Sequence, residues 1–167
     1  MEYLKVSMKK SMKPLLLLAL AVIAVSLGGC REYLWGTEEL IERAREEFPI
    51  ADADGIDIEY AGNSQFEEKF LHWFISGNEY QEHVYLPMEC TLVSGEGFRF
   101  ERVYQPMMRG DDIAVVQWNG GYAFCVNNSA CRTIRIVDSF GENEVRIADK
   151  DDRRPFVYFH PYVPIEY

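Results

Sequence analysis

The chain has 167 residues, a formal net charge of −10 and a hydrophobic fraction of 48%. This apolar content, with 14% aromatic residues, predicts a folded core, and the length allows one domain. Because negative charge of this size repels phosphate backbones, we expect no nucleic-acid partner.

The first thirty residues have the composition and order of an export signal. Four lysines precede Pro14, and an apolar run interrupted only by Ser26 extends from Leu15 to Leu27. A membrane-spanning helix needs roughly 17 to 25 such residues, so this shorter run is typical of the apolar core of a signal peptide. The run ends in the sequence Leu27-Gly28-Gly29-Cys30.

This ending resembles the lipobox of bacterial lipoproteins, in which an aliphatic residue and two small residues precede a cysteine. The resemblance implies that residues 1–29 are removed and that the Cys30 thiol accepts a lipid, so that acyl chains such as palmitate hold the protein on a membrane. In this class, aspartate after the cysteine retains the protein at the inner membrane, whereas Arg31 stands here. The resemblance therefore implies a place on the cell membrane or outer membrane, facing the extracytoplasmic side of the cell envelope.

The rest of the chain resembles small bacterial lipoproteins of unassigned activity, over the stretches WFISGNEYQ, LPMEC and GGYAFCVNN. That resemblance implies no reaction. We divide the chain into a signal peptide at 1–29, a lipidated tether at 30–36 and a single extracytoplasmic β-rich domain at 37–167.

An amphipathic helix is expected at the start of this domain. Thr37 is its predicted N-cap, because acidic residues follow in the first turn, where the helix dipole favours them. Leu40, Ala44 and Phe48 recur at helical spacing, and Pro49 ends the pattern.

From Ile56 onward the apolar residues alternate with polar ones, which is typical of strands. Turn sequences separate these runs at short intervals, so we expect an antiparallel meander of about eight strands, curled or barrel-like. The segment at 69–76 fits either a helix or a strand, and its aromatic and branched residues favour the strand. The predicted fold is mainly β, with an α+β arrangement as the alternative.

Asn119-Gly120 is the strongest turn signal, because a type I′ hairpin needs positive φ at both central residues. With a two-residue loop there, both faces of the hairpin at 113–126 are largely apolar. We therefore expect this hairpin to be central and covered on both sides.

Two histidines are candidate metal ligands. A two-residue loop at Gly77-Asn78 would place His72 opposite His83, close enough to share a metal ion. Glu89 or His160 would have to complete the site. The alternative is two histidines on a half-exposed face without a metal.

Cys125 and Cys131 are candidates for a disulfide, which needs Cβ atoms about 4 Å apart. A two-residue turn at Asn128-Ser129 would point the two side chains away from each other, whereas a wider loop would permit the bond. The alternative is two small buried apolar residues.

The sequence contains no hydrolase, zinc-protease, nucleotide-loop or dinucleotide motif, so we assign no catalytic residue and expect no cofactor. The favoured function is a non-enzymatic binding or interaction module whose partner is an unknown protein or small-molecule ligand. The alternative is a cell-envelope hydrolase whose site combines residues distant in sequence, such as Asp57, Glu59, His72 or His83.

Overall fold

The computed structural model describes residues 33–49, 55–77, 83–93, 95, 97–138, 141–147 and 153–161. The chain divides into two units, Met1–Arg31 and Glu32–Tyr167, and every described residue belongs to the second. The predicted signal peptide and Cys30 lie outside the described residues. Among the residues that are described, no helix is both long and apolar enough to cross a bilayer.

The described strands form three antiparallel sheets, which confirms the prediction of a mainly β fold. Sheet A has six strands in the order β1-β5-β4-β3-β2, with β6 paired to β4, and the bounds of these strands are β1 (Tyr33–Leu34), β2 (Ile58–Phe66), β3 (Lys69–Ser76), β4 (Val84–Val93), β5 (Gly97–Val103) and β6 (Met107–Met108). Sheet B has the order β11-β8-β7 and sheet C pairs β10 with β9, and the bounds of these strands are β7 (Ile113–Trp118), β8 (Gly121–Val126), β9 (Thr133–Asp138), β10 (Gly141–Arg146) and β11 (Phe156–Pro161).

The expectation of one antiparallel meander of about eight strands holds only for β2 to β5. Consecutive strands pair from β2 to β5, but the described strands do not close into a barrel. The chain instead starts new sheets, because β7 and β8 pair with each other and β11 returns to β8 across the β9–β10 hairpin. Alternation of polar and apolar residues predicts strands but does not say which strands become neighbours.

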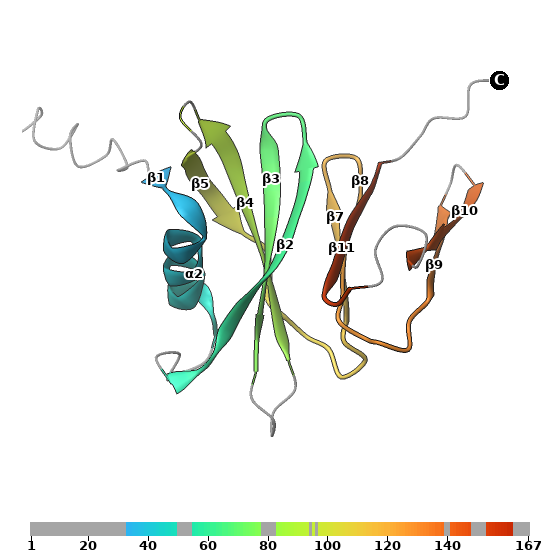
Figure 1. Ribbon diagram of the computed structural model, residues 1–167. Coiled ribbons are helices and arrows are strands. Elements are labelled where there is room, and N and C mark those ends of the chain that lie inside the picture. Colours follow the sequence, from blue (N-terminus) through green and yellow to red (C-terminus); the bar gives the residue numbers. More distant parts are fainter. Residues whose placement is uncertain are drawn as a thin grey trace, which may run out of the picture. The chain divides into compact units, whose positions relative to one another are not determined.

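The core is divided among three interfaces between four layers (Figure 1). Helix α2 (Gly36–Glu47) buries Leu40 and Ala44 against one face of sheet A, which we call the helix face. The opposite face of sheet A packs on sheet B and is called the B face. Sheet B packs on sheet C through its other side.

Helix α2 begins earlier than predicted. Trp35 has the extended conformation of the N-cap, and the helix starts at Gly36 instead of after Thr37. The Glu39 carboxylate accepts a hydrogen bond from the backbone N–H of Trp35 at 2.6 Å. This bond satisfies a donor that the first turn of a helix leaves without a partner.

The segment assigned to the tether is partly structured. Tyr33 and Leu34 form β1, which pairs with the edge of sheet A at Arg99 and Phe98. Leu34 is buried in the core under α2. The described part of the domain therefore begins at Tyr33, three residues after Cys30 and earlier than residue 37.

The β7–β8 hairpin has the predicted two-residue turn. Trp118 lies opposite Gly121, and φ is 42° at Asn119 and 68° at Gly120. The expectation that the whole hairpin is central holds for β8 alone, because β8 lies between β7 and β11 while β7 is an edge strand.

Candidate functional site

A carboxylate is buried in the longest strand of the fold. Glu89 lies in β4, whose sequence VYLPMECTLV contains no other charged residue, and Glu89 is 2% exposed. Cross-strand pairing places it between Leu71 of β3 and Arg102 of β5. Leu71 belongs to the core between sheets A and B, so Glu89 faces the same side.

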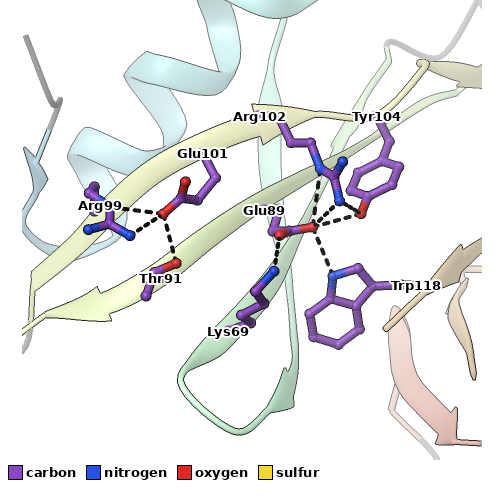
Figure 2. Close-up of polar contacts among 8 residues, drawn as sticks. All are labelled: Lys69, Glu89, Thr91, Arg99, Glu101, Arg102, Tyr104 and Trp118. Carbon is purple, nitrogen blue, oxygen red and sulfur yellow. Dashed lines mark hydrogen bonds and ion pairs between the residues drawn. The ribbon is translucent and has the colours of Figure 1, made fainter. Parts of the chain in front are cut away.

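Four side chains from four strands or adjoining segments donate hydrogen bonds to this carboxylate (Figure 2). Lys69 Nζ lies 3.1 Å from Oε1, and Arg102 Nη2 lies 3.0 Å from Oε2. The Tyr104 hydroxyl donates to Oε2 at 2.7 Å, and the indole N–H of Trp118 donates to Oε2 at 3.2 Å. Because Trp118 ends β7 of sheet B, the Glu89 carboxylate joins the two sheets.

These donors keep Glu89 ionised. Burial alone would raise the pKa of Glu89, but the hydrogen bonds from Tyr104, Arg102 and Lys69 outweigh burial and lower this pKa to about 2. Burial, followed by the hydrogen bond to Glu89, raises the pKa of Tyr104 to about 12, so its hydroxyl remains a donor. The Arg102 guanidinium also lies over the Tyr104 ring, 4.8 Å from its centroid.

A second polar group lies beside the first on the same face. Glu101 Oε1 is 2.7 Å from Arg99 Nη2 and 2.8 Å from Thr91 Oγ1 (Figure 2). Thr91 lies opposite Arg99 on one side and opposite Lys69 on the other. The row continues to the two edges of sheet A, where Tyr33 lies opposite Arg99 and Phe66 lies opposite Lys69.

The chemistry of this site favours positioning of neighbouring side chains by Glu89 over acid–base catalysis or metal binding. Oε2 of Glu89 already accepts hydrogen bonds from Arg102, Tyr104 and Trp118. This oxygen therefore has little capacity left to take a proton or to ligate a metal. A carboxylate with a pKa of about 2 is also a poor general acid near neutral pH. Its charge instead fixes Lys69 and Arg102, which remain 46% and 60% exposed. We call Phe66, Lys69, Thr91 and Arg102 the rim surface.

The structure separates the two histidines that were candidate metal ligands. Ser76 lies opposite Val84, so the β3–β4 connection runs from Gly77 to His83 and is not the two-residue loop that was expected. His72 consequently lies opposite Met88 instead of His83. Among the described residues, no group of three or more metal-binding side chains converges.

Glu89 and His160 do not complete a site with His72. His72 packs with Phe98 on the helix face of sheet A, whereas Glu89 faces sheet B. His160 lies on β11 opposite Tyr122. His72 and Glu89 therefore point to opposite faces of sheet A, and His160 belongs to sheet B.

His72 is a buried neutral side chain. Its Nδ1 lies 3.0 Å from the Tyr60 hydroxyl, which also accepts a hydrogen bond from Asn63. Its Nε2 is buried without a hydrogen-bond partner. Burial lowers the pKa of His72 to about 4, so the imidazole is uncharged near neutral pH.

His83 belongs to a polar cluster that sequence reasoning missed. Its Nδ1 lies 2.7 Å from Asp112 Oδ1, which also accepts the Tyr85 hydroxyl at 2.8 Å. Asp112 has φ of 55°, a conformation in which short polar residues are enriched. The sequence alone does not indicate this cluster, because His83 and Tyr85 are far from Asp112 in the chain.

The cysteines lie on different sides of sheet B. Cys125 is buried in the core between sheets A and B, whereas Cys131 packs against the core between sheets B and C. Among the described residues, Cys90, Cys125 and Cys131 form no disulfide. Burial, with a smaller effect from the charge of Glu59, raises the pKa of Cys125, which therefore behaves as a small apolar residue.

The residues named for a hydrolase do not converge either. Glu59 lies opposite Ile75, which faces sheet B, whereas His72 faces helix α2. Asp57 precedes β2, and His83 is held by Asp112. In comparisons with protein families, curated proteins and solved structures, no match to this chain was found. The function is therefore inferred from the chain's own residues.

Proposed function

We propose that this chain is a lipoprotein whose acylated Cys30 holds one binding module on the extracytoplasmic side of a membrane. The support for the anchor is the short apolar run that ends in Leu27-Gly28-Gly29-Cys30. The early start of β1 is compatible with a mature chain beginning at Cys30, because every described strand lies after that residue.

The proposed binding activity depends on the cationic pair of the rim surface. Lys69 and Arg102 are exposed on a chain that is acidic overall, and both are fixed by one buried carboxylate. Lys69 has three donor protons and Arg102 five, so both keep donors beyond those that Glu89 uses. Such a fixed pair suits a ligand group that carries carboxylate or phosphate oxygens.

The anchor is tested by intact-mass spectrometry of the protein extracted from its native membrane. We expect a chain that begins at Cys30 and carries the added mass of a diacylglyceryl group. The control is Cys30→Ser, which removes the acceptor thiol and should retain residues 1–29 without added lipid. Finding the native chain unprocessed, or Cys30 unacylated, would contradict the proposal.

The binding module is tested by photo-crosslinking in the same membranes. A benzophenone side chain replaces Phe66 on the rim surface and, in a matched variant, Val137 on β9, which is 66% exposed. We expect an adduct of defined mass from position 66 and none from position 137. Equal adducts at both positions, or none at position 66, would argue against a binding role for the rim surface.

A further inference from the structure

Two large aromatic side chains are exposed at and just after β1. Tyr33 and Trp35 are 46% and 52% exposed, whereas Leu34 between them is buried under α2. Side chains alternate along an extended segment, so Tyr33 and Trp35 point to the same side. Exposed aromatic residues grouped in this way often mark a contact surface.

The Trp35 ring is seated on the backbone of sheet A. A Cβ atom added at Gly97 would lie 2.7 Å from Cζ3 of Trp35, so the ring lies directly against this glycine. Tyr33 is fixed opposite Arg99 by the β1–β5 pairing. We call Tyr33 and Trp35 the aromatic corner. Both rings are held by the fold while much of their surface remains open.

The chain between Cys30 and the aromatic corner is very short. An extended residue spans at most about 3.6 Å, so the Tyr33 and Cys30 Cα atoms lie within about 11 Å of each other. Acyl chains on Cys30 place that residue at the surface of the hydrocarbon layer. The polar interface of a bilayer is several ångströms thick on each side. The short connection to Cys30 therefore keeps the aromatic corner in or next to this interface.

We propose that the aromatic corner lies in the headgroup region of the bilayer that holds Cys30, an inference that rests on the proposed lipid anchor. Tyr and Trp are enriched at membrane interfaces because their rings are apolar and their O–H and N–H groups are polar. This contact sets the orientation of the domain relative to the membrane. Because β1 and β2 are opposite edges of sheet A, the β1 edge meets the membrane and the β2 edge, with Phe66 and Lys69, is turned away from the anchor.

Tryptophan fluorescence tests this contact directly. The chain has three tryptophans, and Trp73 and Trp118 are buried in the core between sheets A and B. Quenchers therefore act chiefly on Trp35. The native acylated protein is placed in phosphatidylcholine–phosphatidylglycerol vesicles in which part of the phosphatidylcholine is brominated near the headgroup. We expect bromolipid quenching together with protection from aqueous iodide by about twofold or more, as for an interfacial ring.

Two variants make the result specific. Trp35→Phe keeps an aromatic ring against Gly97 and should remove both effects. Val137→Trp in the Trp35→Phe background moves the exposed indole to β9 of sheet C, where iodide should quench it and bromolipid should not.

The inference is overturned if iodide quenches Trp35 as strongly as it quenches the indole at position 137 in the same vesicles. The acyl mass of the sample, measured first, separates this outcome from failure of the anchor. An acylated protein with an accessible Trp35 leaves the lipoprotein proposal intact, whereas an unacylated Cys30 contradicts both.

Discussion

Glu89 is a charge in a strand that is otherwise built for the core. Its neighbours in β4, Met88 and Cys90, are fully buried on the helix face, while Glu89 itself faces sheet B. Burying a carboxylate is costly unless donors compensate it, and here Lys69, Arg102, Tyr104 and Trp118 provide them. The compensation depends on the carboxylate being present and charged.

Replacing Glu89 by Gln should therefore destabilise the domain strongly. The amide has no charge, and its NH₂ group faces donors, so we expect a loss of about 3–5 kcal/mol in the free energy of unfolding. Urea denaturation at neutral pH measures it. Glu101→Gln is the control, because its ion pair with Arg99 is more exposed and should contribute less than about 1 kcal/mol. Equal losses in the two variants would contradict this account of Glu89.

His72 should make stability depend on pH. The pKa of His72 is about 4 in the folded domain and about 6.5 in an unfolded chain, so the unfolded chain binds more protons between these values. Stability is therefore full above pH 6.5 and falls as the pH drops toward 4. The shift corresponds to about 3 kcal/mol.

The variant His72→Phe, which keeps a ring beside Phe98, should lack this component. The difference in unfolding free energy between variant and parent should move in favour of the variant as the pH falls from 7 to 4. Glu89 affects stability at lower pH, because its pKa is also depressed. Its contribution to the free energy of unfolding is lost as the pH falls from about 4.5 toward 2. Parallel profiles for parent and variant between pH 7 and 4 would rule out the assigned role of His72.

At the scale of elements, the pairing of β8 with β11 requires a glycine at position 121. A Cβ atom at Gly121 would clash with the backbone carbonyl oxygen of His160 and lie 2.8 Å from Cα of Pro161. These are backbone atoms of β11, so they cannot move aside without loss of the strand pairing.

Gly121→Ala should therefore cost about 3 kcal/mol of unfolding free energy, at the upper end of overpacking effects. The matched control is Gly55→Ala, where an added Cβ meets no atom within 4 Å, and we expect a change within about 0.5 kcal/mol. Thermal or urea unfolding of both variants measures the difference. Similar stability of the two would show that β11 is not tightly paired at this point.

Local signals in the sequence predicted individual elements well. The strand at 69–76 and the type I′ turn at Asn119-Gly120 were found from residue types that restrict the backbone directly. The β3–β4 connection was misplaced because Gly77-Asn78 also looks like a tight turn, whereas the pairing of Ser76 with Val84 leaves a longer loop. A turn dipeptide marks a change of direction but not the register that follows it.

The candidate site could not be predicted because it is made by strand order. Lys69, Glu89 and Arg102 meet only because β3, β4 and β5 are neighbours in that register, and Trp118 reaches Glu89 from another sheet. The same holds for His83 and Asp112, which are joined across a long stretch of chain. Composition and spacing carry no information on such contacts until the pairing of strands is known.

At the scale of the whole domain, sheet A carries both the packed core and the two proposed contact surfaces. The core under α2 and the core between sheets A and B hold sheet A from both sides, while its uncovered part carries the rim surface and the aromatic corner. These two surfaces lie toward opposite edges of one sheet. Because the strands between these two edges are paired in one sheet, a membrane contact at the β1 edge would orient the β2 edge toward a ligand.

The return of β11 to β8 also determines when the domain can finish folding. Sheet B contains residues 113–126 but is completed only by residues 156–161, after the β9–β10 hairpin has been made. Until then, β8 has one unpaired side and Trp118 lacks the Phe159 ring that packs against it. A chain threaded through a secretion channel from its N-terminus would thus reach its native state late in translocation.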